Sequence, residues 1–198
     1  QLWQEDLQLD RMAFELDGRG RAWQLTTFVA ENPELYLYTQ GNWRPDPDYE
    51  LGWLELQGRL EHVQLSSLYK YFPDDVGTDV ISWLKAGLQQ GSLEQGRFTL
   101  RGDVDAFPFQ SEQEKGYFDV TGTIRGAQID YWQAAAHERT WPLLRDIEGQ
   151  LRIERAGLYG NFTQASVFID PASPVQATAL AITIPNMEHD SVVHIDAQ

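Results

Sequence analysis

Apolar residues occur at every second position along most of this chain. Because successive side chains of a β-strand point to opposite faces, this alternation predicts strands with one apolar face and one polar face. The alternating segments are separated by Gly, Pro, Asn or Asp, which favour turns. They span residues 7–16, 22–30, 35–39, 53–65, 97–104, 117–132, 146–158, 161–169 and 175–184. The pattern predicts a mainly β fold with long antiparallel strands.

A longer pattern recurs in three of these segments. Apolar residues and a Gly step by two, and the series then jumps by three positions, at Glu61-His62, Arg125-Gly126 and Glu154-Arg155. A jump of three moves the apolar side chains to the other face, unless a β-bulge inserts a residue and bends the strand. A two-residue hairpin is the alternative, but two of these pairs lack the Gly or Asn that such turns favour. We therefore expect bulges, which would bend the strands into a curved sheet with an apolar inner face.

The inner face of this sheet is the candidate site. An ordinary sandwich core and an open groove fit it equally well, because both need one apolar face. Gly58, Gly102 and Gly122 would remove side chains from this face, which relieves crowding or leaves room for a ligand. The candidate lining residues are Leu54, Leu56, Leu60, Phe98, Leu100, Val104, Phe118, Val120, Ile124, Ile129, Ile147, Leu151, Ile153 and Leu158.

One segment, 79–90, has the periodicity of a short amphipathic helix. Val80, Trp83, Leu84 and Leu88 fall on one helical face, and a Gly follows the segment. The helix would bury Trp83 and Leu84, either as a fixed plug against the sheet or as a movable lid over a ligand. Both roles are compatible with the sequence.

Composition and motifs argue against several classes of function. The formal net charge of −15 disfavours binding to nucleic acid or to anionic lipid headgroups, since both attract Lys and Arg. There are no cysteines, and no run of about 18 apolar residues that could span a bilayer. The chain also lacks a Ser-His-Asp order, a P-loop and a dinucleotide fingerprint. We expect no enzymatic activity, no cofactor and no membrane span in this segment.

Two pairs of polar residues are better explained as surface residues than as chemistry. Asp103 and Asp105 share the polar face of a predicted strand, so we expect a solvated outer face rather than paired catalytic carboxylates. His189 and His194 have a spacing that suits neither one helical face nor one strand face. We therefore expect exposed residues on an edge strand rather than a metal site.

The order of short motifs from residue 65 onwards resembles the central domain of the YhdP branch of the AsmA-like family. The order is Phe-Pro, Trp-Leu, Gly-x-Leu, Phe-Pro-Phe, Gly-x-Phe, Trp-Pro and Ile-Pro, and it includes Phe72-Pro73, Phe107-Pro108-Phe109, Tyr131, Trp141-Pro142 and Ile184-Pro185-Asn186. The resemblance covers roughly residues 54–195, and the first fifty residues add little to it. We expect one groove segment over residues 1–198, with leading strands in 1–50 and the family-like part in 51–198.

The resemblance implies a function as well as a fold. Members of this family are very large envelope proteins of Gram-negative bacteria, thought to carry phospholipids between the two membranes. A member would keep its curved sheet as an open trough, filled by acyl chains rather than by a second sheet. This chain would then be a periplasmic piece of a protein anchored in the inner membrane, next to neighbouring groove segments. The implied activity is passive, non-enzymatic transport of phospholipids between the inner and outer membranes.

The tryptophans support an alternative hypothesis. An acidic, aromatic, cysteine-free β protein is also typical of a carbohydrate-binding β-sandwich module, in which tryptophan rings stack on sugars. The tryptophans are scattered along the chain, however, at Trp3, Trp23, Trp43, Trp53, Trp83, Trp132 and Trp141. We therefore keep carbohydrate binding as the alternative to lipid transport.

Overall fold

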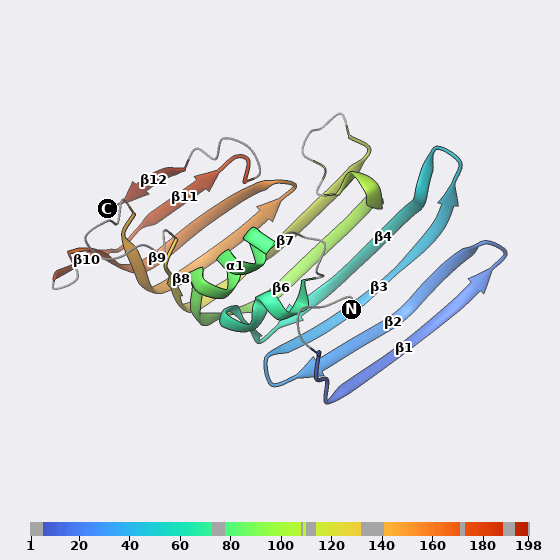
Figure 1. Ribbon diagram of the computed structural model, residues 1–198, viewed down its shortest axis with the longest axis horizontal. Coiled ribbons are helices and arrows are strands. Elements are labelled where there is room, and N and C mark those ends of the chain that lie inside the picture. Colours follow the sequence, from blue (N-terminus) through green and yellow to red (C-terminus); the bar gives the residue numbers. More distant parts are fainter. Residues whose placement is uncertain are drawn as a thin grey trace.

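The computed structural model describes residues 6–72, 78–107, 109, 114–131, 141–170, 173–187 and 193–197. In this part of the chain, one 12-stranded antiparallel sheet has the order β1-β2-β3-β4-β6-β7-β8-β9-β11-β12, with β5 beside β6 and β10 beside β9 (Figure 1). The strands are β1 (Arg11–Arg19), β2 (Ala22–Asn32), β3 (Leu35–Asp46), β4 (Tyr49–Glu61), β5 (Val63–Gln64), β6 (Leu88–Asp103), β7 (Gly116–Ile129), β8 (Leu143–Glu154), β9 (Gly157–Asp170), β10 (Ser173–Ala177), β11 (Leu180–Ile184) and β12 (His194–Ala197). The predicted mainly β, antiparallel fold is confirmed.

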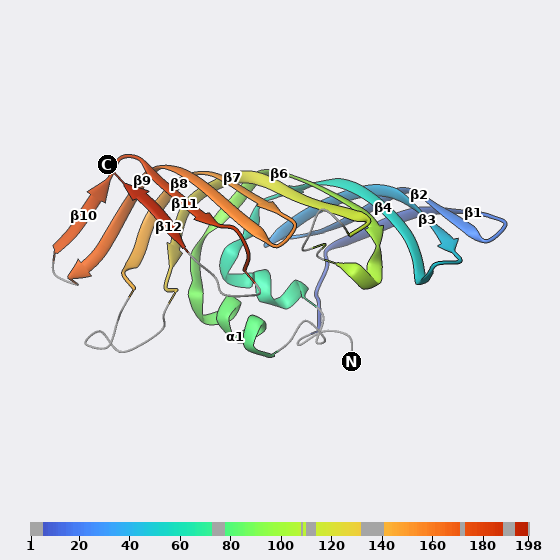
Figure 2. The ribbon, with the colours of Figure 1, turned by 90° about the horizontal axis from the view of Figure 1, so that it is seen from above.

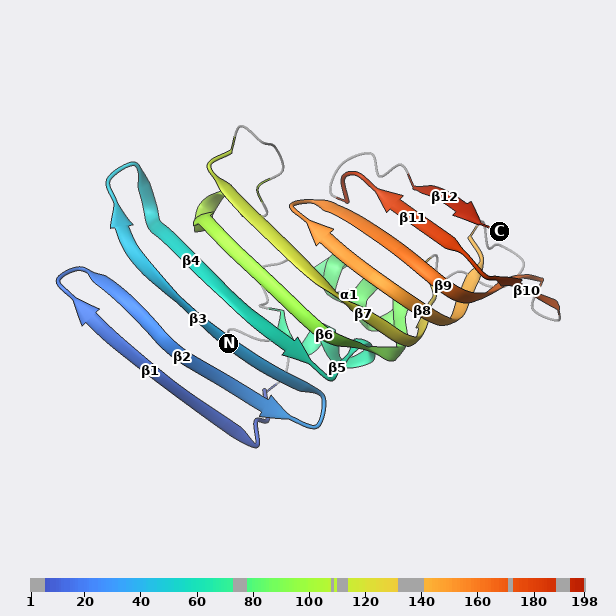
Figure 3. The same ribbon diagram turned by 180° about the vertical axis from the view of Figure 1, so that it is seen from behind.

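The sheet is open and curved. β1 and β12 end the strand order, and they lie towards opposite ends of the molecule. Figure 2 shows the sheet as an arch, with the 3-10 helix η1 (Leu65–Tyr71) and the helix α1 (Thr78–Gly87) on its concave side. Figure 3 shows the convex side, where α1 lies behind the strands. The prediction of a curved sheet that does not close on itself is confirmed.

Two of the three sequence jumps are irregularities within continuous strand pairs, as expected. At Glu61-His62, β4 gives way to β5, yet both pair with β6, and His62 has a φ of 56°. At Arg125-Gly126 the register between β7 and β8 shifts, and Gly126 has a φ of 58°. The apolar residues on either side of each jump pack in or against one cluster: Leu60, Val63, Ile124 and Ala127.

The third jump is a tight hairpin, so the expected bulge at Glu154-Arg155 is wrong. β8 ends at Glu154, which pairs with Gly157 at the start of β9. Arg155 takes a φ of 55°, a conformation that is uncommon for a residue with a side chain. Its backbone N–H donates to the carbonyl oxygen of Phe118 at 2.8 Å, and its guanidinium donates to the carbonyl oxygen of Phe109 at 3.0 Å. These tertiary hydrogen bonds hold the turn where Gly or Asn is absent.

Two further boundaries differ from the prediction because sheet pairing overrides local periodicity. The predicted helix 79–90 ends at Gly87, and Leu88 already pairs with Ile129 as the first residue of β6. β6 is therefore much longer than the predicted strand 97–104. The predicted strand 175–184 is divided into β10 and β11, which both pair with β9.

Candidate functional site

One row of directly paired residues crosses the sheet from β1 to β11. We refer to this row as the concave row, and its members are Phe14, Phe28, Thr39, Gly58, Phe98, Val120, Ile153, Leu158 and Ile184. Thr39 is its one polar member, and the Thr39 hydroxyl donates to the carbonyl oxygen of Gln57 at 3.0 Å. Because directly paired residues point to the same side of a sheet, the row is a continuous path over these strands that is interrupted by a polar side chain only at Thr39.

The apolar side of the sheet is the concave side. Leu65 of η1 and Leu84 of α1 share one hydrophobic cluster with Leu93, Ile124 and Ile147 of the sheet. Both helices lie on the concave side of the arch (Figure 2). The residues next to these rows point the other way, and many are polar, as in the paired series Asp17, Gln24, Asn42, Glu55, Arg101 and Tyr117.

The register places the predicted lining residues on this face, with the exception of Val104. Leu54, Leu56, Leu60, Phe98, Leu100, Phe118, Val120, Ile124, Ile129, Ile147, Leu151, Ile153 and Leu158 lie in rows of apolar or Gly positions. Val104 lies instead in η3 (Val104–Ala106), a 3-10 turn that follows β6. The alternation was sufficient for most of these assignments because the residues lie where the pairing register is continuous. Ile129 and Ile147 lie beside register shifts.

The concave face has a covered part and an open part. Ile147 is 1% exposed beneath the helices, and Ile124 is also buried. Leu151 is half-buried but packs against the buried cluster. Towards the other strand ends, the side chains are half-buried: Leu54, Leu56, Phe98, Leu100, Phe118, Val120, Ile153 and Leu158. We refer to these residues as the open floor. A ligand can reach the open floor without displacing a helix, whereas Ile124 and Ile147 already contact the protein's own side chains.

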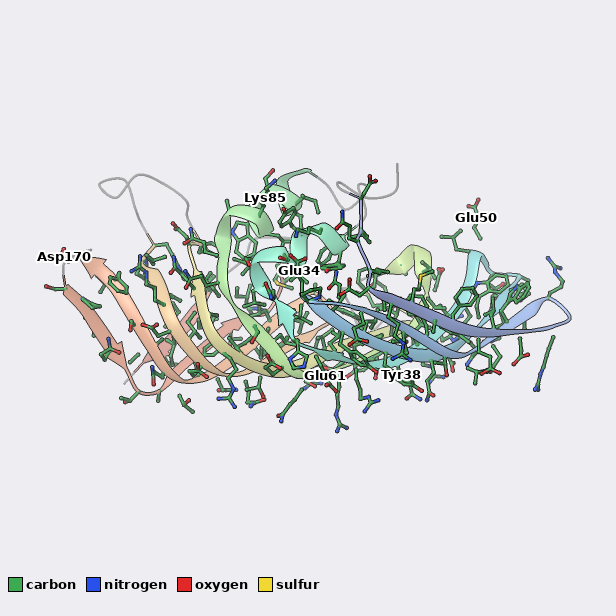
Figure 4. The ribbon with its side chains drawn as sticks, turned by 90° about the horizontal axis from the view of Figure 1, so that it is seen from below. Glu34, Tyr38, Glu50, Glu61, Lys85 and Asp170 are labelled. Carbon is green, nitrogen blue, oxygen red and sulfur yellow. The ribbon has the colours of Figure 1, made fainter. Side chains whose placement is uncertain are left out.

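Polar contacts fasten η1 to the hairpin between β2 and β3. Lys70 Nζ lies 2.7 Å from Glu34 Oε1, and the Tyr71 hydroxyl lies 2.9 Å from Asn32 Nδ2, which donates to it. The hydrogen bond from Lys70 is the main reason why the pKa of Glu34 lies below its ordinary value of 4.5. Figure 4 places Glu34 on the same side of the sheet as Lys85 of α1, opposite Tyr38 and Glu61.

α1 is held by two buried side chains, Ile81 and Leu84, and by the contacts of Trp83. Leu84 is buried in the cluster, as expected, and the half-buried Trp83 donates its indole N–H to the carbonyl oxygen of Tyr131 at 3.1 Å. The Trp83 and Tyr131 rings also meet edge to face, with centroids 5.7 Å apart. Val80 is exposed, so it does not share the buried face as predicted, and Ile81 takes that place. We refer to η1 and α1, which together cover one side of the concave face, as the plug.

The helices bound the open floor on one side, and the residues that follow η3 bound it at the opposite strand ends. We refer to these two boundaries as walls. Phe109 is 1% exposed, and its ring fills the space above Gly102 and Gly116, which pair with each other. A Cβ added at Gly102 would lie 2.7 Å from Phe109 Cζ, so only Gly fits there. Leu93 similarly fills the space above Gly122. The glycines on the inner face therefore relieve crowding between protein groups, and do not leave room for a ligand.

The concave face extends to the edge strand β1, where sequence reasoning assigned no site residue. Phe14 is 62% exposed and Trp23 is 47% exposed, and both pair with apolar or Gly positions of this face. Met12 and Leu16 are exposed on the same face. The signal that would have found them is the same period of two, which continues through residues 7–16. These four side chains extend the uncovered apolar surface of the concave face to the edge of the sheet.

The convex face carries ion pairs and polar hydrogen bonds. Arg152 Nε lies 2.6 Å from Asp119 Oδ1, and this hydrogen bond raises the pKa of Arg152 above its ordinary value. The indole N–H of Trp53 donates to Glu55 at 3.0 Å, which lowers the pKa of Glu55. Arg101 lies 3.4 Å from Glu55 across the strand pair. The two faces of the sheet therefore offer opposite environments within one layer.

The other sequence candidates do not assemble into a site. Asp103 is buried at the end of β6, so the expected solvated position is wrong for this residue; the side chain of Asp105 lies outside the described part. His194 is exposed on the edge strand β12, as expected, and His189 lies outside the described residues. Within the described ranges, no three His, Asp or Glu side chains come together in a way that could hold a metal ion.

The tryptophans do not form one stacking platform. Trp23 and Trp43 face each other on the concave side, whereas Trp53 lies on the convex side near Arg101. Trp83 and Trp141 flank Tyr131 at the carboxyl end of β7. Trp3 and Trp132 lie outside the described residues. The carbohydrate alternative gains no support from this distribution.

Comparisons with known proteins place the chain in a family. The family model described as YhdP protein matches residues 1–198, which includes the first fifty residues that carry little of the motif order. Comparisons with curated proteins and with solved structures gave no match. The part of the chain that the structure describes contains no helix with the length and hydropathy of a membrane span.

Proposed function

This chain belongs to the YhdP family, and we propose that its concave face is one segment of a groove that conducts phospholipids. The observation that carries the proposal is the concave row, which presents apolar side chains, one Gly and one internally bonded Thr from β1 to β11. In a sandwich this face would be buried against a second sheet. Here the helices cover only part of it, and the open floor faces solvent.

The mechanism follows from the chemistry of acyl chains. Each methylene that leaves water for an apolar surface contributes about 0.8 kcal/mol, so the open floor holds a tail by area alone. Methylenes are interchangeable, so a tail that slides from one strand to the next keeps a similar buried area. No bond is formed or broken, and transport in this proposal is passive and non-enzymatic. Headgroups remain in water at the uncovered side of the floor.

The proposal also has a cellular setting. We infer that the chain works in the periplasm, as part of an inner-membrane-anchored protein of the Gram-negative envelope. Tails would pass between neighbouring groove segments of the same polypeptide at β1 and β12, the two ends of the sheet. The net charge of −15 gives the groove no general attraction for anionic headgroups, which is consistent with recognition of the tails.

Photo-crosslinking tests the proposal. A benzophenone amino acid at Leu56, Leu100, Val120 or Leu151 is expected to capture phospholipid in cells. Matched positions on the convex face, Glu55, Thr99 and Asp119, serve as controls because they alternate with or pair beside these residues. Capture from the convex positions alone would reject the groove. Native mass spectrometry of protein purified without detergent should independently show bound phospholipid.

A further inference from the structure

We infer that Phe107 is a wall residue of the groove, which holds acyl chains against Phe118 of the open floor. This inference rests on the proposed function and adds a residue that neither the sequence pattern nor the sheet register selects. Phe107 follows η3, and its backbone N–H donates to the carbonyl oxygen of Val104 at 3.3 Å. η3 lies on the concave side of the sheet, at the end of β6 (Figure 2).

The ring of Phe107 touches the floor but is not buried by it. Its centroid lies 5.0 Å from that of Phe118, at an interplanar angle of 74°. Phe118 pairs with Leu100, so this contact is with the open floor and not with the plug. Phe107 nevertheless remains 50% exposed. The free half of the ring adds apolar surface beside the place where a tail would lie.

The segment that carries Phe107 is rigidly attached two residues later. Phe109 is fully buried over Gly102 and Gly116, and its ring meets that of Phe107 edge to face at 6.1 Å. Its carbonyl oxygen accepts a hydrogen bond from Arg155 of the next hairpin. Phe109 also has a φ of 61°, which a non-Gly residue keeps when its surroundings over-determine it. Because Phe109 anchors this segment, we expect the exposed ring of Phe107 to keep its position when a ligand binds.

The two walls stand at opposite ends of the same strand. On β7, Phe118 lies under Phe107, whereas Ile124 lies under the plug. Six residues of strand separate them, which corresponds to roughly 20 Å along β7. Val120 lies between them and belongs to the open floor. A tail that crosses the strands would therefore run along a trough with the plug on one side and Phe107 on the other.

The test compares Phe107→Ala with Tyr38→Ala, which removes an aromatic ring from the convex face of the sheet (Figure 4). Each protein is incubated with vesicles of phosphatidylethanolamine that contain a radiolabelled phospholipid, re-isolated, and counted for label per chain. Phe107→Ala should fold normally and retain about fourfold less label for each methylene contact that is lost, because each contributes about 0.8 kcal/mol. Tyr38→Ala should retain as much label as the unmodified chain.

The outcomes separate this inference from the proposed function. Equal label on the unmodified chain and on Phe107→Ala overturns the role of Phe107 and leaves the groove intact. An unmodified chain without label removes both. A benzophenone amino acid at position 107 gives a second readout that keeps an aromatic ring and does not depend on how the Ala variant folds. Lipid capture at 107 supports the inference, and capture at Leu100 without capture at 107 overturns it.

Discussion

The guanidinium of Arg155 donates a hydrogen bond to the carbonyl oxygen of Phe109 across 3.0 Å. This bond joins the hairpin between β8 and β9 to the segment that follows η3, two places that are 46 residues apart in sequence. Arg155 also lies over the Tyr117 ring, with its Cζ 5.9 Å from the centroid. One side chain thus connects a strained turn, the start of β7 and the wall beside the open floor.

Replacing Arg155 should therefore be more costly than replacing an exposed arginine. Arg155→Ala removes a charge-assisted hydrogen bond and is expected to lower the free energy of unfolding by about 1.5–3 kcal/mol. Arg155→Gly loses the same bond but adopts a φ of 55° without strain, so it should be more stable than the Ala variant by up to about 1 kcal/mol. Urea unfolding of the two variants checks this order, and an Ala variant as stable as the unmodified chain would contradict it.

An aspartate on the open floor should stop lipid binding without unfolding the chain. Leu100→Asp leaves a carboxylate that stays hydrated while the groove is empty, but that a sliding tail would have to desolvate at a cost of several kcal/mol. The control Gln57→Asp puts the same charge on the convex side of the neighbouring strand. Thermal melts and lipid capture should show a folded Leu100→Asp without lipid and a Gln57→Asp that binds normally.

The same substitution under the plug should behave differently. Ile147→Asp buries an unpaired charge at a position that is 1% exposed, and we expect it to lower the free energy of unfolding by more than about 4 kcal/mol. Comparing the loss of unfolding free energy in Ile147→Asp and Leu100→Asp distinguishes the covered core from the open floor on the same face. Equal destabilisation by the two aspartates would show that the open floor is packed as tightly as the covered part.

Thiol labelling can decide whether α1 stays fixed on the sheet or moves as a lid. The chain has no cysteine, so single cysteines at Val120 and Ile124 report on one strand without background. A fixed plug predicts rapid reaction of Val120→Cys with a maleimide and strong protection of Ile124→Cys, because Ile124 lies in the cluster under the helices. A lid that opens in the presence of phospholipid vesicles would instead expose Ile124→Cys to the reagent.

Acid should weaken the attachment of η1 through Glu34. The pKa of Glu34 is lowered below 4.5 in the folded chain by its hydrogen bond with Lys70, so its stabilising contribution is present above pH 4.5 and is lost as pH falls through the lowered pKa. Glu34→Gln should therefore be less stable than the unmodified chain at pH 7 and should approach it in stability at pH 3. Urea unfolding across this range tests the sign. Glu50→Gln is the control, because Glu50 lies at the other end of β4, away from Glu34 (Figure 4). Its stability relative to the unmodified chain should not show this pH dependence.

The period of two was informative wherever a strand is paired on both sides. It assigned faces correctly for residues such as Leu56, Phe98 and Ile153, because the pleat alone fixes which way each side chain points. It also extended to the first strands, where it had not been used to select site residues. The faces of the sheet were thus available from the sequence before any contact was known.

The errors occurred where distant contacts decide the local structure. Arg155 turns the chain without a turn-forming residue because Phe118 and Phe109 accept its hydrogen bonds, and neither is near it in sequence. Leu88 fits a helix by its spacing from Leu84, but β7 recruits it into the sheet. Phe107 could not be selected by periodicity, since it lies in a loop that no repeat describes.

The exposure of Phe14 and Trp23 has a consequence for the stability of the folded chain. Full burial of an aromatic or aliphatic side chain contributes about 1.5–3 kcal/mol to the free energy of unfolding. Phe14 and Trp23 are exposed, so they make much of this contribution only when a ligand covers the face. Any occupant that binds the folded form alone raises its stability by RT ln(1 + [L]/Kd), about 2.7 kcal/mol at a hundredfold excess over Kd. The melting temperature is therefore a measure of occupancy as much as of sequence, and delipidated and lipid-loaded preparations of one chain should melt as if they were two proteins.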